Sequence, residues 1–209
     1  MKRLLIIGAG GFGREVLDIA LEQPQCGVEW VPSGFLDSRT ELVEGGHLPL
    51  PVLMSPHDYQ PNAGDLLICA VDKPTDKRYY IRMMLERGAN FISLIHPDVD
   101  VSSSSSIGLG CIVYKYARLG PGACLGDFST LGYCSGLGHD AVVGTFSQLS
   151  SHVSINGRCI IGDEVLVGAS VTVHPDVRVG NSSVLGIGSV VIRNVAAGKT
   201  VFGVPAKGL

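Results

Sequence analysis

The sequence predicts a small parallel α/β domain followed by a larger parallel β-helix, and three observations support this fold class. Residues 1–95 alternate between apolar extended segments and helical patterns, as in strand–helix–strand units. From Val101 onward an aliphatic residue recurs at every sixth position. Glycine supplies 28 of the 209 residues while aromatic residues make up only 6%, so the core must be built from aliphatic and small side chains.

Composition excludes several other classes of protein. With 45% hydrophobic residues and a net charge of −3, the chain can bury a core and is not intrinsically disordered. The 16 basic residues are outnumbered by 19 acidic ones and form no cluster, so we expect no nucleic-acid partner. No apolar stretch approaches the roughly 18–20 residues needed to cross a bilayer, and there is no secretory cleavage site. The six cysteines lack metal-finger spacing, which indicates reduced thiols in a cytoplasmic protein without membrane insertion.

The N-terminal half is expected to form a parallel sheet with helices. Leu66–Val71 is a continuous apolar run of the kind that a buried parallel strand shows. Gly13–Glu22 has one apolar face, and Pro74 suits the first turn of a second helix. The predicted elements are a strand over 2–7, a helix over 13–22, an extended segment over 28–36, a strand over 66–71, a helix over 74–87 and a closing segment over 91–95. We assign residues 1–98 to this α/β domain and residues 99–209 to the β-helix.

The repeat of the C-terminal half specifies its geometry. Sixteen consecutive positions from Val101 to Val191, six residues apart, are Val, Ile or Leu, and glycine follows ten of them. The position two before each of them holds only Ser, Ala, Cys or Val. We interpret each hexad as a short strand with an inward aliphatic side chain, a corner that requires glycine's conformational freedom, and a small residue inside the corner. Three sides per coil predict a triangular prism of about five coils.

The repeat resembles the left-handed β-helix of the hexapeptide-repeat acyltransferases. Five further segments read GAGGFGREV, FLD, IHP, GHD and GVPAK, and they occur in the order 8–16, 35–37, 95–97, 138–140 and 203–207. Together with the repeat they resemble the sugar acyltransferases of the sialic acid O-acetyltransferase type. That group includes N-acetyltransferases acting on nucleotide-linked 4-amino sugars. The resemblance covers essentially the whole chain.

This resemblance implies a left-handed β-helix that assembles as a homotrimer. The N-terminal domain would hold a nucleotide-sugar, and acetyl-CoA would lie along the β-helix between neighbouring subunits. We therefore expect an acetyl-CoA-dependent acyltransferase that acetylates a sugar, foremost the amino group of a nucleotide-linked 4-amino sugar, in surface-polysaccharide or glycan synthesis. We expect acetyl-CoA as co-substrate, no metal, and direct transfer, because no activated Cys or Ser is evident.

His139 is the candidate general base. It follows Gly138 at a corner of the expected β-helix, and Asp140 matches the family's acidic neighbour. Acyl transfer from a thioester needs a base to take the acceptor's proton, and an imidazole can do this near neutral pH. We expect the carboxylate of Asp140 to orient the ring.

The resemblance also assigns the contacts to acetyl-CoA. Gly157 follows His139 by 18 residues, or one coil, and its backbone N–H is expected to bind the thioester oxygen as negative charge develops there. The other expected contacts to acetyl-CoA are Gln148, Ala169 and Ile187.

The glycine-rich turn after the first strand is the candidate nucleotide-sugar site. A glycine turn between a strand and a helix can place a pyrophosphate at the helix N-terminus. In the resembling family this turn meets the nucleotide-sugar, and residues at the positions of Asp37 and Ser38 contact the base. The substrate-binding residues carried over are Gly10, Gly11, Phe12, Asp37, Ser38 and Asp72.

Four positions depart from the family pattern. Phe12 stands where the family has His, and Asp72 stands where it has Gly. Gln148 replaces a His on the CoA side, and Gly132 replaces an Asn seven residues before the catalytic His. A phenyl ring cannot hydrogen-bond a phosphate. The changes concern the acceptor and CoA pockets rather than the base, and they leave the identity of the nucleotide-sugar open.

Three alternatives remain open. The acceptor could be a sugar hydroxyl, because the same base would serve O-acetylation. The chain could be a metal-dependent hydratase, with His152 and His174 joining His139 around a metal. It could also be a non-catalytic β-helix scaffold, because the Phe12 and Gly132 changes allow a decayed acceptor pocket.

Overall fold

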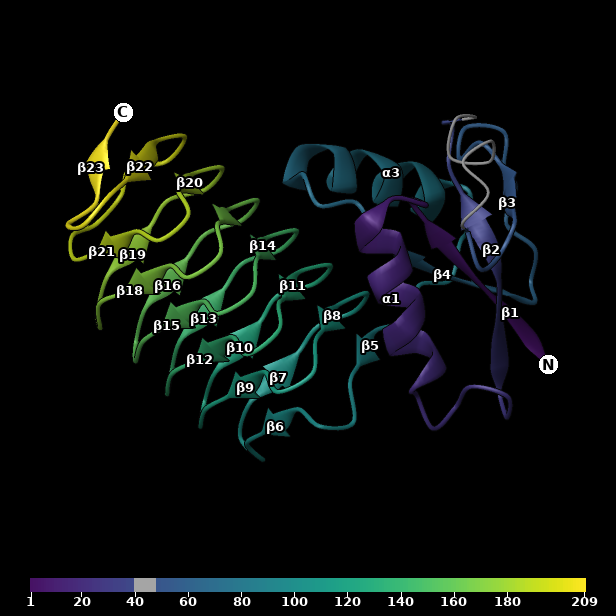
Figure 1. Ribbon diagram of the computed structural model, residues 1–209, viewed down its shortest axis with the longest axis horizontal. Helices are drawn as coiled ribbons and strands as arrows, with labels where there is room; N and C mark the ends of the chain where they lie inside the picture. Colours follow the sequence, from purple (N-terminus) through teal and green to yellow (C-terminus); the bar gives the residue numbers. More distant parts are fainter. Residues whose placement is uncertain (40–47) are drawn as a thin grey trace. The chain divides into compact units, whose positions relative to one another are not determined.

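The computed structural model describes residues 1–39 and 48–209, which form two compact units, Met1–Leu94 and Ile95–Leu209 (Figure 1). His47, which the sequence indicates to be a solvated residue of a proline-rich loop, lies outside the described residues. No helix within the two described ranges is long and apolar enough to cross a membrane.

The first unit is built on a four-stranded parallel sheet with the strand order β3-β2-β1-β4. Its elements are β1 (Lys2–Ile7), α1 (Gly11–Leu21), β2 (Trp30–Leu36), β3 (Val52–Met54), β4 (Asp65–Cys69) and α3 (Pro74–Glu86). The parallel α/β fold expected from the sequence is confirmed. The sequence did not predict β3, which has only three residues, and Phe91 forms only an isolated bridge with Leu67.

The two central strands explain why the sequence located this sheet. β1 lies between β2 and β4, and its Leu4–Ile7 side chains are buried, as are all five residues of β4. A parallel strand covered on both faces reads as a continuous apolar run. The helix α1 contacts β1 and β2 and buries Val16, Leu17 and Ala20.

Asp65 anchors the start of β4 through a buried polar network. Its carboxylate accepts two hydrogen bonds from the Arg3 guanidinium, at 2.8 and 2.9 Å, and one from the Tyr59 hydroxyl at 2.5 Å. Asn62 donates from its backbone N–H and its side-chain amide. Burial alone would raise the pKa of Asp65, but these hydrogen bonds outweigh it and lower the pKa to about 2. The charged carboxylate therefore ties β1 to the loop that precedes β4.

Asp65→Asn is expected to lower the free energy of unfolding by about 1–2 kcal/mol at neutral pH, because Arg3 loses its ionic partner. A carboxyl with a depressed folded pKa stabilises above its unfolded pKa of about 4, and this contribution is lost as pH falls toward 2. Urea unfolding of both proteins between pH 7 and pH 2 measures the gap. A gap that stays constant down to pH 2 would contradict the role given to Asp65.

The second unit is a parallel β-helix whose strands recur every six residues (Figure 1). Strands that pair on one side are 18 residues apart, as Cys124 with Val142 and Leu131 with Leu149 show. Each coil therefore has three sides of six residues. The β-helix predicted from the hexad repeat is confirmed.

Three sheets form the sides of the prism. The first side contains β7 (Ser106–Ile107), β10 (Cys124–Leu125), β13 (Val142–Val143), β16 (Ile160–Ile161) and β19 (Arg178–Val179). The second side contains β6 (Asp100–Val101), β9 (Arg118–Leu119), β12 (Gly136–Leu137), β15 (Ser154–Ile155), β18 (Thr172–Val173) and β21 (Val190–Val191). The third side contains β5 (Leu94–Ile95), β8 (Ile112–Val113), β11 (Thr130–Leu131), β14 (Gln148–Leu149), β17 (Leu166–Val167), β20 (Val184–Leu185), β22 (Thr200–Phe202) and the antiparallel β23 (Lys207–Gly208).

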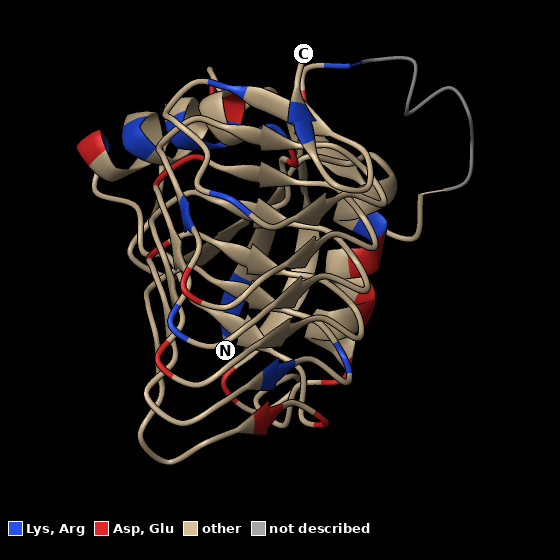
Figure 2. Cartoon of the chain, turned by 90° about the vertical axis from the view of Figure 1, so that its left-hand side faces the viewer, with Lys and Arg blue, Asp and Glu red and all other residues tan. Residues whose placement is uncertain are grey.

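Charged side chains are dispersed over the coils rather than gathered. In the view of Figure 2, basic and acidic residues are interspersed around the β-helix. Some pair across consecutive coils, such as Arg118 with Asp100 at 3.2 Å and Arg158 with Asp176 at 2.6 Å. These ion pairs follow the 18-residue spacing of the coils.

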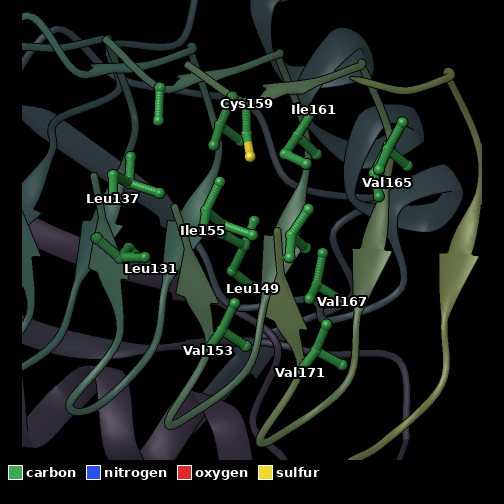
Figure 3. Close-up of a cluster of buried hydrophobic side chains, with 14 of the residues drawn as sticks. Leu131, Leu137, Leu149, Val153, Ile155, Cys159, Ile161, Val165, Val167 and Val171 are labelled. Carbon is green, nitrogen blue, oxygen red and sulfur yellow. The ribbon is translucent and has the colours of Figure 1, made fainter. Parts of the chain in front are cut away.

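The aliphatic residue of each hexad points into the prism. Figure 3 shows Leu131 and Leu149 of the third side in one cluster with Leu137 and Ile155 of the second side. Each of these four side chains is at most 2% exposed. Val101, in the first strand of the second side, is an exception because it is 42% exposed.

The small residue of each hexad also lies inside, and serines at this position link the coils. The Ser147 hydroxyl donates to the Gly162 carbonyl at 2.9 Å and accepts from the Val165 N–H at 3.0 Å. Ser129 makes the equivalent pair of bonds with Gly144 and Ser147. Buried hydroxyls are tolerated here because both their donor and an acceptor lone pair are used.

The hexad glycines are needed for space and not for backbone freedom, so the sequence interpretation of the corner is wrong on this point. The ten glycines that follow an inward aliphatic residue lie between residues 108 and 186, and none has a positive φ. The left-handed conformation occurs two residues later, where Asp140 and Phe146 have φ of +58° and +57°. A Cβ on Gly132 would lie 2.5 Å from the backbone carbon of Ser150 in the next coil. The next coil passes so close that only hydrogen fits.

Gly132→Ala is expected to lower the free energy of unfolding by about 1–3 kcal/mol, because the methyl group must push the next coil away. Gly136 in β12 is the matched control, since its φ is not positive and a Cβ there would meet no atom within 4 Å. Gly136→Ala should leave stability unchanged or raise it slightly. Urea unfolding measures both variants, and equal destabilisation by the two would show that space is not the constraint.

Candidate active site

The first unit contains a cavity of about 400 Å³ at the carboxyl ends of its parallel strands. It is lined by the turns after β1, β2 and β4, by Pro56 after β3, and by α3. The structure brings all six predicted substrate-binding residues to this one cavity, namely Gly10, Gly11, Phe12, Asp37, Ser38 and Asp72.

The glycine-rich turn presents the N-terminus of α1 to the cavity. The helix begins at Gly11, and the capping residue Gly10 offers no side chain to its first N–H groups. The first turn also carries no acidic residue. The positive end of the helix dipole is thus available to a bound anion such as a phosphate. Gly8, at φ +101°, is required because a Cβ there would lie 2.6 Å from the Ala70 carbonyl oxygen.

Asp37 holds Arg39 beside this turn. The guanidinium donates to both carboxylate oxygens, at 2.9 and 2.6 Å, and the Ala9 N–H donates to the same carboxylate at 2.8 Å. Burial would raise the pKa of Asp37, but the hydrogen bonds from Arg39 and Ala9 lower it below its usual range. The Nη2 atom of Arg39 lies 3.3 Å from where a Cβ of Gly10 would stand. The guanidinium therefore lies at the glycine-rich turn, with its charge balanced by the Asp37 carboxylate.

Sequence reasoning missed Arg39, Pro56, Asp76 and Tyr80, which all line the cavity. Arg39 follows a strand without any motif that would mark it. Pro56 follows β3, which the sequence did not reveal. Asp76 pairs with Lys73 at 3.2 Å, and both Asp76 and Tyr80 lie within α3. Only the fold brings these positions to one edge of the sheet.

In the second unit, His139 stands at a corner of the β-helix directly after β12. Its side chain is 54% exposed, and its Nδ1 lies 2.9 Å from Asp140 Oδ2. Asp140 occupies the left-handed corner position, from which its carboxylate reaches back to the ring. A proton on Nδ1, donated to Asp140, leaves the lone pair of Nε2 to accept a proton.

Gly157 lies one coil further on and is stacked against the His139 ring. A Cβ on Gly157 would meet His139 Cε1 and Cδ2 at 2.8 and 2.9 Å, and Nε2 more closely. Within the described residues the Gly157 N–H donates no hydrogen bond. The neighbouring Arg158 is held by two hydrogen bonds to Asp176, at 2.6 and 2.8 Å. One corner therefore combines an imidazole, its carboxylate partner and a backbone donor.

The other predicted acetyl-CoA contacts lie on a different side of the prism. Gly157 follows β15 of the second side, whereas Gln148 belongs to β14 of the third side. Ala169 follows β17 and Ile187 follows β20, also on the third side. Gln148 is buried and Ile187 is 65% exposed. A single chain thus brings Gly157 to His139 but not the other three residues.

The histidines considered as metal ligands do not converge with His139. His152 follows β14 of the third side, and His174 follows β18 of the second side, with its Nδ1 3.0 Å from the Pro175 carbonyl oxygen. Across residues 1–39 and 48–209, no group of three His, Cys, Asp or Glu side chains is placed to hold a metal ion.

Known proteins share both units of this architecture. Residues 3–75 match the family described as the PglD N-terminal domain. The acetyltransferase domain of PglB from Neisseria gonorrhoeae, solved with acetyl coenzyme A, is 30% identical, with a TM-score of 0.89 over 100% of this chain and 99% of that chain. A variant of perosamine N-acetyltransferase from Caulobacter crescentus, solved with CoA and GDP-perosamine, is 23% identical, with a TM-score of 0.86 over 100% and 97%. WeeI from Acinetobacter baumannii is 22% identical, with a TM-score of 0.88 over the whole of both chains. No curated protein sequence matched the chain.

The chain has a two-unit fold with a left-handed β-helix, and it matches the acetyl-CoA complex over its whole length. The protein is therefore an acetyl-CoA-dependent acyltransferase. More particularly, the chain belongs to the hexapeptide-repeat sugar acetyltransferases.

Gly157→Ala is expected to reduce acetyl transfer by at least about 10²-fold while the protein stays folded. The three atoms nearest to the new methyl group all belong to the His139 side chain, so the ring is displaced from Asp140 while the backbone of the coil keeps its place. Release of free CoA thiol in the presence of an accepted sugar measures the transfer, and thermal unfolding reports the fold. Gly136→Ala is the control, and unchanged transfer by Gly157→Ala would contradict the stacking.

Proposed function

We propose that the protein transfers the acetyl group of acetyl-CoA to the amino group of a nucleotide-linked 4-amino sugar, with His139 as general base. The observation that carries this proposal is the contact of Gly157 with the His139 ring, while Asp140 holds Nδ1. A base, an orienting carboxylate and an N–H donor at one corner are the groups that attack on a thioester requires.

The proposed reaction proceeds by direct attack. The neutral amine attacks the thioester carbonyl carbon, and Nε2 of His139 takes a proton from the attacking nitrogen. The Gly157 N–H stabilises the negative charge on the carbonyl oxygen. The carbon–sulfur bond then breaks, the CoA sulfur leaves with the electron pair and receives the proton from His139, and an amide remains. Asp140 keeps the ring oriented throughout.

The cavity of the first unit is proposed to bind the nucleotide-sugar. The N-terminus of α1 supplies partial positive charge for a diphosphate, and the Arg39 guanidinium, although paired with Asp37, presents N–H donors beside it. The Caulobacter crescentus enzyme was solved with GDP-perosamine, which is a nucleotide-linked sugar. Because Phe12 cannot hydrogen-bond a phosphate, the backbone of Gly10 and Gly11 and the side chain of Arg39 would make these contacts.

A homotrimer is part of the proposal, because the expected acetyl-CoA contacts are divided between two sides of the prism. Gln148, Ala169 and Ile187 of one subunit would complete the site at His139 and Gly157 of its neighbour. The proposal also includes acetyl-CoA as the only cofactor and a cytoplasmic location, with all six cysteines as free thiols.

The test begins with a thermal-shift screen of nucleotide-linked amino sugars in the presence of CoA, because a ligand at 100 times its Kd adds about 2.7 kcal/mol of stability. With an accepted sugar, His139→Ala is expected to lower turnover by about 10²–10⁴-fold. Lys199→Ala, which removes an exposed cationic side chain just before β22 and touches none of the proposed contacts, is the control and should retain wild-type turnover.

The product distinguishes the acceptor atom. An acetyl group that survives mild alkali is an amide and supports N-acetylation, whereas its release would show O-acetylation of a hydroxyl. Wild-type transfer by His139→Ala to a verified acceptor would overturn the proposed base.

A further inference from the structure

An aromatic cluster borders the cavity of the first unit. Tyr80 lines the cavity from α3 and is half-buried. Its ring centroid is 5.7 Å from that of His57 at an interplanar angle of 56°, and 5.3 Å from that of Tyr79 at 72°. Both neighbours meet the Tyr80 ring at steep angles and do not stack flat on it. They therefore fix the orientation of the ring without covering it in a parallel stack.

The aromatic cluster is held in place before any ligand binds. The Arg87 guanidinium, at the C-terminal end of α3, donates to the Pro56 carbonyl at 3.1 Å and to the Tyr59 carbonyl at 2.7 Å. The loop that carries Pro56 and His57 is thus tied to the helix that carries Tyr80. Preorganised aromatic rings are effective binding surfaces because little conformational entropy is lost on binding.

The same cavity offers hydrogen-bonding groups beside the ring. Ser38, whose hydroxyl lies 2.9 Å from that of Ser55, lines it together with Asp72 and Asp76. Burial and the nearby charge of Asp37 raise the pKa of Tyr80, so its phenol stays neutral at physiological pH. A neutral aromatic face with donors and acceptors nearby suits a flat heterocycle that carries polar edge groups.

We propose that the Tyr80 ring is the surface on which the nucleobase of the substrate stacks. The inference rests on the proposed nucleotide-sugar function and adds the position of the base within that site. Stacking on an aromatic ring is tolerant of base identity, so Tyr80 would supply affinity while Ser38 and Asp72 would discriminate between bases.

Calorimetric titration of the full-length protein with UDP, GDP and dTDP tests the proposal. For the tightest of the three, Tyr80→Leu is expected to weaken binding by about 5- to 150-fold, the range measured for loss of one base–aromatic stack. Tyr80→Phe keeps the ring and should bind within about 3-fold of wild type. Tyr116→Leu is the matched control and should bind as the wild type does, since Tyr116 lies in the second unit, is 53% exposed and does not line the cavity.

Ribose 5-phosphate, which has no base, separates stacking from general damage. Its binding should be equal in the wild type and Tyr80→Leu, and equal melting temperatures would show that the variant is folded. Nucleotide binding by Tyr80→Leu at the wild-type level overturns the stacking role, and an equal loss in Tyr80→Phe overturns it in favour of the hydroxyl. If the wild type binds none of the three nucleotides, the proposed nucleotide-sugar function fails, and the inference fails with it.

Discussion

The close approach of consecutive coils governs both the sequence of the repeat and the composition of the candidate catalytic corner. Residues 18 positions apart lie over one another, so the side chain at one position limits what its counterpart can carry. Gly132 has no side chain because the backbone at Ser150 occupies that space. The same constraint operates at Gly157, where the obstacle is the His139 ring instead of backbone. A glycine required by packing thereby becomes an N–H group beside a base.

Much of this architecture could be predicted because the period of the repeat determines the length of each side and which residues point inward. The inward aliphatic residues and the small buried residues of the hexads follow from period and size alone, as Leu149 and Ser147 show. The role of the hexad glycines could not be predicted, because a sequence does not distinguish a glycine needed for its φ from one needed for its size. The short strand β3 was missed because three residues carry no periodicity.

The candidate sites show the same division. Sequence motifs mark His139 with Asp140, and they also mark the glycine-rich turn. The fold places Asp140 against the His139 ring, and it places the turn at the cavity of the first unit. Arg39 and Tyr80 also line the cavity, but neither belongs to a sequence motif. Arg39 lies after a strand, and Tyr80 lies within a helix. The Phe12 side chain lines the cavity without a hydrogen-bonding group, while Arg39, paired with Asp37, places its guanidinium at the same turn.

A crystal structure of the protein with acetyl-CoA and an accepted nucleotide-sugar tests the central claim most directly, because the claim concerns positions of atoms. The account predicts the thioester carbonyl oxygen within about 3.1 Å of the Gly157 nitrogen, and the acceptor atom in hydrogen-bond reach of His139 Nε2. A thioester directed to another donor, with His139 turned away from the acceptor, would contradict it.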